Sequence, residues 1–176
     1  MTNKADSVNL HFYGLGIELR SADGKTIDTI RREFRYFEGK HGAADLIIEA
    51  FDEDPPFGSL PDIAPSVYTV DYVTYHTKQE IFTDYHGRGL RIFKPKDKQY
   101  LVFSKSIDLR HEICYLTVLS TVGEYLDLRH IHRVHALGIS RNNKAILILL
   151  PEKGGKSTLA LQLLRLGEVK LLSEDS

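Results

Sequence analysis

The sequence predicts an α/β fold with an α+β N-terminal region, in which a mixed sheet containing a meander precedes a strand–loop–helix–strand unit. Three observations predict it. Short runs of β-branched and aromatic residues fill the first part of the chain. Two segments place apolar residues at helical spacing. From residue 144 onward the pattern runs apolar strand, glycine-rich loop, helix and strand, which is typical of the opening of an α/β domain.

The N-terminal region begins with strand signals and one helix. Residues 8–19 mix β-branched, aromatic and glycine residues, which are strand signals, and Asp23-Gly24 is expected to form the turn after them. Residues 26–39 predict a helix that ends at Gly39, because their apolar residues recur every three to four positions: Ile27, Ile30, Phe34 and Phe37. Residues 44–51 read as a short buried strand.

The middle of the chain predicts a loop, a meander and a long helix. Residues 52–65 hold four prolines, which a sheet interior does not accept, so we expect a loop there. Four β-rich runs follow with turn residues between them, at 66–77, 80–86, 89–95 and 99–106. Residues 108–128 predict a helix with Asp108 as its N-cap, on which Cys114 is expected to be a small buried hydrophobe.

The last part of the chain places a glycine-rich loop between a strand and a helix. Residues 133–140 and 144–150 predict two strands joined by a turn at 141–143. Residues 158–166 predict a helix that ends at Gly167, with its inward face formed by Leu159, Leu163 and Leu166. A further strand is expected at 169–173, parallel to and beside the strand at 144–150, with two acidic residues at its end.

The loop carries the second half of a phosphate-binding motif. Gly154 and Gly155 allow the backbone to approach a phosphate, and Lys156 would neutralise the charge of the β- and γ-phosphates. The Ser157 hydroxyl would help to hold Mg²⁺, and Thr158 could donate a further hydrogen bond. The following helix adds the partial positive charge of its N-terminus. We therefore predict a nucleotide site in which Lys156 lies at the surface of the loop.

The first half of the loop departs from the full motif G-x-x-x-x-G-K-[ST]. Leu150 stands where the first glycine is required, and Pro151 removes one backbone N–H from the loop. Glu152 brings a negative charge that Lys153 could offset. An ordinary turn between a strand and a helix, without nucleotide, is the alternative interpretation of the same residues.

Residues 135–175 resemble the kinase domain of HPr kinase/phosphorylase and of HPr-kinase-like ATP-binding proteins. The resemblance rests on the order and spacing of "VHALGIS", "RNNK", "AILILL", "PEKGGKST", "LALQLLRLG" and "VKLLSED". It covers about the last quarter of the chain. We therefore expect residues 106–176 to form an incomplete HPr-kinase-like P-loop domain behind a mixed N-terminal region at 1–105. In that family the chain extends beyond the paired acids, so this chain would be a fragment or a shortened relative.

The resemblance implies ATP and Mg²⁺ as cofactors and phosphate transfer to a serine hydroxyl of a protein, peptide or small molecule. Its paired acids, usually Asp-Asp, fall on Glu174 and Asp175. One would act as the base for the attacking hydroxyl, and Asp175 would share Mg²⁺ with Ser157. The family's histidine falls on His135, near the nucleotide. Glutamate at position 174 is one methylene longer than aspartate, which could displace the base by about 1 Å.

A catalytically degenerate module that binds a nucleotide or a protein is the second function class, favoured by Pro151 and Glu152. The net charge of −1 argues against nucleic acid and anionic membranes as partners. One cysteine, no secretion signal and no long apolar run predict a cytoplasmic protein, and a homo-oligomer remains compatible with the sequence.

Three other residue groups receive structural interpretations. His130, His132 and His135 would make an awkward metal site, because on a strand the first two share a face and the third points to the other. Cys114 and His111 lie three residues apart but lack a visible oxyanion-stabilising element. The tyrosines of the meander are expected to pack on the sheet rather than stack on bases: Tyr68, Tyr72, Tyr75 and Tyr85.

Overall fold

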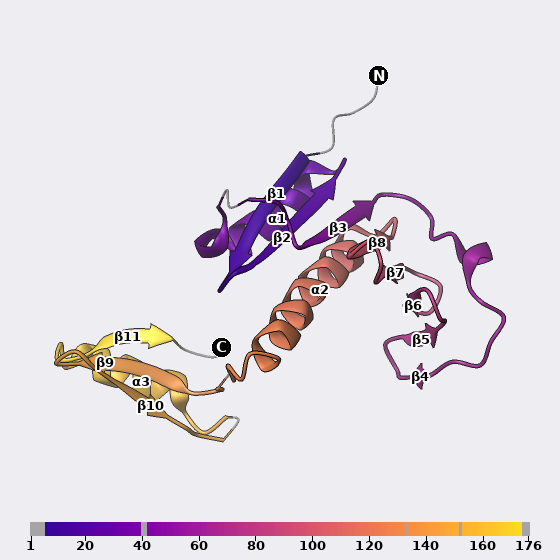
Figure 1. Ribbon diagram of the computed structural model, residues 1–176. Coiled ribbons are helices and arrows are strands. Elements are labelled where there is room, and N and C mark those ends of the chain that lie inside the picture. Colours follow the sequence, from indigo (N-terminus) through magenta and orange to yellow (C-terminus); the bar gives the residue numbers. More distant parts are fainter. Residues whose placement is uncertain (1–5, 40–41, 133, 152, 174–176) are drawn as a thin grey trace. The chain divides into compact units, whose positions relative to one another are not determined.

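The computed structural model describes residues 6–39, 42–132, 134–151 and 153–173. It is a mixed α+β structure whose contacts divide it into two compact units, with the division between Tyr125 and Leu126 (Figure 1). Unit 1 contains a large mixed sheet, and unit 2 contains a small antiparallel one. The fold class is thus a mixed α+β arrangement, with the meander that the sequence predicts.

Unit 1 is built on an eight-stranded sheet in the order β1-β2-β3-β8-β7-β6-β5-β4. Strands β2, β3 and β8 run parallel to one another, and every other neighbouring pair is antiparallel. The consecutive strands β4 to β8 confirm the meander. The strands are β1 (Asp6–Phe12), β2 (Leu15–Ser21), β3 (Leu46–Phe51), β4 (Val67–Tyr68), β5 (Val73–His76), β6 (Ile81–Asp84), β7 (Leu90–Lys94) and β8 (Gln99–Phe103).

The first strand signal contains a hairpin instead of one strand. Phe12 pairs with Leu15 across a two-residue turn, in which Tyr13 and Gly14 have φ values of 51° and 99°. Positive φ at both central positions is the geometry of a tight hairpin turn. The strand signals at residues 8–19 are therefore confirmed, and the turn at Tyr13 and Gly14 divides them between β1 and β2.

Helix α1 (Gly24–Glu33) begins where a turn was predicted. Asp23 has extended backbone angles, and its carboxylate accepts a hydrogen bond from the backbone N–H of Lys25, so Asp23 is the N-cap. The helix ends at Glu33 and a short 3₁₀ turn, η1 (Arg35–Phe37), follows. The predicted end at Gly39 is wrong, since the Gly39 N–H instead donates to the carbonyl of Asn9 on β1.

The proline-rich segment after β3 is a loop, as predicted, with one short 3₁₀ turn, η2 (Phe57–Ser59). Two of its apolar side chains, Phe57 and Leu60, pack against a core cluster of Phe82, Leu90 and Ile92. The loop thereby covers part of one face of the sheet.

Helix α2 (Ile107–Asp127) packs within unit 1 along nearly its whole length. Tyr115 stacks on Phe34 with ring centroids 5.4 Å apart, and Thr117 accepts a hydrogen bond from Arg91 on β7. These contacts put the division between the units about 20 residues after the boundary expected at 105/106. Ser106, rather than Asp108, caps the helix, since its hydroxyl accepts from the N–H of Leu109.

Unit 2 is a three-stranded sheet in the order β10-β9-β11 with one helix beside it (Figure 1). Its elements are β9 (Leu137–Arg141), β10 (Lys144–Ile148), α3 (Lys156–Arg165) and β11 (Lys170–Ser173). Leu137, Ile139 and Ala160 form its buried cluster, with Leu159 and Leu163 packed against it. Leu166, which was expected to face inward, is 71% exposed.

The turn at 141–143 and the stop at Gly167 are both confirmed. Asn142 and Asn143 have φ values of 50° and 59°, and Gly167 has a φ of 71°. Within the described residues, none of the helices has both the length and the apolar character that crossing a membrane would require.

Candidate functional site in unit 2

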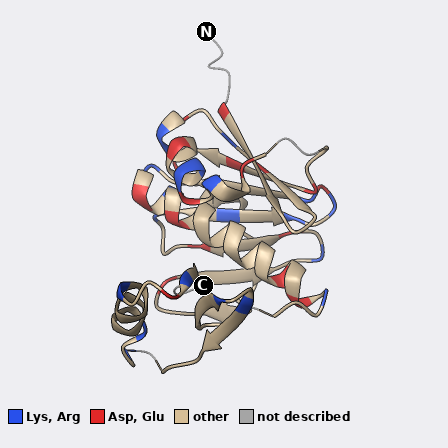
Figure 2. Ribbon diagram, turned by 90° about the vertical axis from the view of Figure 1, so that its left-hand side faces the viewer, with Lys and Arg blue, Asp and Glu red and all other residues tan. Residues whose placement is uncertain are grey.

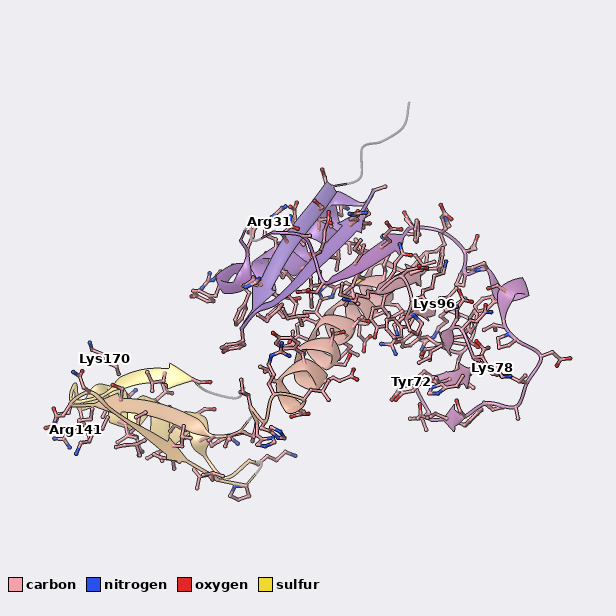
Figure 3. All side chains as sticks on the ribbon, viewed as in Figure 1. Arg31, Tyr72, Lys78, Lys96, Arg141 and Lys170 are labelled. Carbon is pink, nitrogen blue, oxygen red and sulfur yellow. The ribbon has the colours of Figure 1, made fainter. Side chains whose placement is uncertain are left out.

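The last residues of β10 and β11 and the first residues of β9 lie at one edge of the unit 2 sheet, the edge that the strand ends form. Strands β10 and β11 both run antiparallel to β9, so they point the same way. Ile148 at the end of β10 pairs with Leu137, and Ser173 at the end of β11 pairs with Gly138. The loop after β10, the end of β11 and the segment before β9 therefore share this edge. Arg141 and Lys170 mark the opposite edge (Figure 3).

The predicted neighbourhood of β11 and β10 needs a correction. We expected these strands to lie side by side in a parallel sheet, but β9 lies between them and is antiparallel to both. The reason is that β10 follows β9 through a tight turn and therefore pairs with it. The other side of β9 is then available to β11. Their common direction, on which the shared edge depends, is unaffected.

The Lys156 side chain is held against His135 at this edge. The Nζ of Lys156 lies 2.8 Å from Nε2 of His135, and Lys156 is only 7% exposed. An ammonium group has only donors, so a charged Lys156 would donate to Nε2 of His135 in this contact. The two residues named from the sequence are thus brought together, but the surface position expected for Lys156 is wrong.

The loop before α3 is a tight turn of restricted backbone. The Gly154 N–H donates to the carbonyl of Pro151, 2.9 Å away, and Lys153 has a φ of 59°. A Cβ on Gly154 would lie 2.8 Å from that same carbonyl oxygen, so only glycine fits. Gly155 is left-handed with a φ of 84°. The two glycines are needed for the turn, and the N–H of Gly154 is used within it.

The N-terminus of α3 has no side-chain cap, whereas that of α1 does. A Gly-Lys-Ser/Thr sequence lies at the start of both helices: Gly24 is the first residue of α1, whereas Gly155 is the N-cap that precedes α3. In α1 the Asp23 carboxylate accepts from the first-turn N–H of Lys25 and would repel an anion. In α3 the cap is Gly155, which has no side chain to accept these hydrogen bonds. Of these two helices, α3 is therefore the one that presents its first turn and its partial positive charge to an outside anion.

These residues line a cavity of about 690 Å³, a size typical of small-molecule sites. The lining is polar and basic, and it consists of His135, Lys153, Gly154, Gly155, Lys156, Ser157 and Thr158. Residues 154–158 were expected to bind the nucleotide and His135 to lie near it as a catalytic residue, whereas Lys153 was expected only to offset the charge of Glu152. A second lysine directly before the glycines was the signal available for it.

The lysines and the first-turn N–H groups at the cavity are donors that fit a phosphate group. Of the residues predicted to bind Mg²⁺, the described part of the chain contains Ser157. Ser157 lies in the exposed first turn of α3 and lines the cavity. The other residues predicted for metal and catalysis, Glu174 and Asp175, lie outside the described residues, as does Glu152. What the structure supplies for them is the position of Ser173, directly before the pair, at the edge that carries the loop.

The remaining histidine and cysteine candidates receive no support as sites. His130, with a φ of 59°, and His132 precede β9 and lie on no strand, so the face argument made for them does not apply. No group of three or more metal-ligating side chains is found in the portion of the chain that the structure describes. Cys114 is fully buried, and burial raises the pKa of its thiol to about 12, so it is not a nucleophile.

Comparison of the chain with protein-family models, with curated proteins and with solved structures found no match.

Proposed function

We propose that unit 2 binds a nucleoside polyphosphate through the start of α3 and transfers phosphate to a serine hydroxyl of a protein, peptide or small molecule. The contact between Lys156 and His135 beside the uncapped N-terminus of α3 carries the proposal. The Lys156 ammonium, the positive end of the α3 dipole and the backbone N–H donors of its first turn lie at one cavity. Phosphoryl transfer relies on such an arrangement of positive charge and donors.

ATP and Mg²⁺ are the cofactors in this proposal. Lys156 and the backbone N–H groups of Ser157 and Thr158 would bind phosphate oxygens, and the Ser157 hydroxyl would be one ligand of the metal. Bound Mg²⁺ would neutralise charge on the phosphates. Glu174 and Asp175 complete the proposal as base and second metal ligand, because the sheet brings the preceding residue, Ser173, to the correct edge.

The Nε2 of His135 lies 2.8 Å from the Nζ of Lys156, so we propose that His135 helps to position the lysine for a phosphate. A phosphate oxygen would then replace the ring nitrogen as the acceptor. A cytoplasmic location belongs to the same proposal, since ATP is present there and the single cysteine fits a reducing compartment.

Thermal unfolding of the full chain with and without Mg-ATP tests the binding step. A ligand at 100 times its Kd stabilises the state it binds by about 2.7 kcal/mol, so the unit 2 transition should shift upward. Lys156→Ala should abolish the shift, and Lys25→Ala, which changes the matched Gly-Lys-Thr of α1, should retain it. The binding proposal fails if nucleotide does not shift the unfolding of the unaltered chain. It also fails if Lys156→Ala and Lys25→Ala lose the shift equally.

A nucleotide-binding module without catalysis is the second candidate, and one observation favours it. Pro151 has no N–H, and the Gly154 N–H is taken by the Pro151 carbonyl, so the loop offers fewer donors than a complete phosphate loop. Release of ADP from Mg-ATP, measured with a serine-containing acceptor library, separates the two. Binding without turnover selects the module, and turnover that Lys156→Ala removes selects the phosphotransferase.

A further inference from the structure

Besides the cavity at the start of α3, the chain has a cavity in unit 1, between the ends of β2 and β3. These strands are parallel, and the chain leaves them toward opposite faces of the sheet. After β2 the chain enters α1, on the face where Phe12 contacts Phe34 with ring centroids 5.7 Å apart. Phe12 shares that face with Leu10 and Ile17 through the β1–β2 register.

The chain that leaves β3 goes to the other face. Phe57 and Leu60 in the loop after β3 pack against the core cluster that contains Ile92. The register places Ile92 opposite Leu101, Leu101 opposite Glu49 and Glu49 opposite Arg20, so all lie on the face away from α1. A point where neighbouring parallel strands send their connections to opposite faces opens a crevice at the carboxyl ends of the strands, where ligands bind.

A cavity of about 310 Å³ lies at this point. It is lined by the last residues of β2 and β3 and the residues directly after them: Arg20, Ser21, Ala22, Glu49, Ala50, Phe51, Asp52 and Glu53. Alanine and phenylalanine supply an apolar surface, and three carboxylates stand around it. A small ligand with an apolar body and one charged group would fill this volume.

The charges of the cavity select a cation. Arg20 is already committed, since it donates to Glu18 at 2.7 Å and lies 3.5 Å from Glu49. Asp52 is bound by the buried Arg110 at 3.2 Å. Glu53 makes no ion pair within the described part of the chain, and its carboxylate is exposed beside the cavity. An anion would find no uncommitted cation here, whereas an ammonium group would find Glu53 and the outer side of Glu49.

We propose that this crevice binds a small organic cation, a primary ammonium group on a short apolar body. The apolar part contacts Ala22 and Phe51, and the ammonium donates to Glu53 and Glu49. A bare metal ion does not fit, because the described residues contain no cluster of three ligating side chains. The inference does not depend on the α3 site, since all of its residues belong to unit 1.

Titration of the ¹⁵N-labelled full chain with benzylammonium at neutral pH tests the proposal. The backbone N–H signals of Ala22, Ala50 and Glu53 should shift along saturating curves. Benzyl alcohol and benzoate, which have the same ring without the positive charge, should not reproduce these shifts. Glu53→Gln should raise the Kd about fivefold, the upper end of the weakening expected for loss of an exposed ion pair.

Glu80→Gln is the matched control, because Glu80 borders a separate cavity together with Lys96, whose place in the meander is labelled in Figure 3. Its Kd should equal that of the unaltered chain. Absence of shifts at the three amides overturns the proposal, as do equal shifts with benzyl alcohol or an unchanged Kd for Glu53→Gln. Shifts of the same amides by Mg²⁺ alone would also overturn it, in favour of a metal site.

Discussion

At the scale of single residues, the most constrained side chain is Arg110 in unit 1. It is 1% exposed, and its guanidinium bonds to Asp23, Asp52, Thr26 and the carbonyl of Ser104. A buried charge is tolerated only when it is paired and hydrogen-bonded, and here it ties α2 to the ends of β2, β3 and β8. The sequence offered no sign of this arginine, since nothing distinguishes it locally from the solvated arginines of a helix.

Asp23→Ala should destabilise unit 1 by about 3–5 kcal/mol, because it leaves the guanidinium of Arg110 buried without its closest carboxylate and removes the cap of α1. Urea unfolding followed by circular dichroism measures this loss. The control is Asp28→Ala, which removes an exposed partner of Arg31 on the same helix and should cost less than about 1 kcal/mol. Equal losses in the two variants would contradict the role given to Arg110.

The same carboxylate gives a pH dependence. Burial by itself would raise the pKa of Asp23, but hydrogen bonds from Thr26, Arg110 and the Lys25 N–H outweigh it and lower the pKa below its ordinary value of 3.8. A lowered folded-state pKa stabilises the protein above the unfolded value, and this contribution is lost as the pH falls through the folded pKa. The free energy of unfolding should therefore fall below about pH 4 more steeply in the unaltered chain than in Asp23→Ala. Parallel pH profiles would contradict it.

Cys114 should resist thiol reagents while unit 1 is folded. Burial raises the pKa of its thiol from 9.0 to about 12, so the reactive thiolate is scarce and the sulfur is shielded. Labelling with a chromogenic disulfide at pH 8 should be slow in buffer and complete in denaturant. Rapid labelling of the native chain would show that α2 does not pack as described.

At the scale of elements, two helices that start at a Gly-Lys-Ser/Thr sequence have different surroundings. The residues before them decide this: an aspartate caps α1, and a glycine turn leaves the start of α3 open. The sequence predicted the glycine turn, because glycines before a helix and an apolar strand before them are local signals. It did not predict that Asp23 caps α1, since Asp-Gly is equally typical of a hairpin turn.

Gly154→Ala should weaken nucleotide binding about tenfold or more without affecting unit 1. The added Cβ would lie 2.8 Å from the Pro151 carbonyl oxygen, so the turn that positions the start of α3 must shift. Isothermal titration with Mg-ADP measures the effect, and displacements of about 1 Å commonly cost on this scale. Gly58→Ala, in open space within the loop of unit 1, is the control and should bind normally.

At the scale of the whole molecule, the chain consists of two units with separate cores. Fold class, meander, the loop at 52–65 and the order of elements after residue 136 followed from local patterns. The order of strands in the sheets could not be predicted from local patterns. The pairs β3–β8 and β9–β11 join strands that are far apart in the sequence. The same reason hid the extent of α2 within unit 1, which is set by contacts with β7 and α1.

Leu137→Ala should loosen unit 2 and leave unit 1 unchanged. Leu137 is fully buried in the unit 2 cluster, and such truncations cost about 2–5 kcal/mol. Native-state hydrogen exchange should show faster exchange for amides of β9, β10 and β11, with those of β1 to β8 unchanged. Faster exchange throughout both sheets would mean that the two units unfold as one.

The central claim, that the start of α3 and not that of α1 receives phosphate, is tested most directly in one spectrum of the ¹⁵N-labelled chain. Addition of Mg-ADP should shift the backbone N–H signals of Gly155, Ser157 and Thr158 and leave those of Lys25 and Thr26 in place. Shifts at Lys25 and Thr26, or no shift at Ser157 and Thr158 at millimolar nucleotide, would contradict the account.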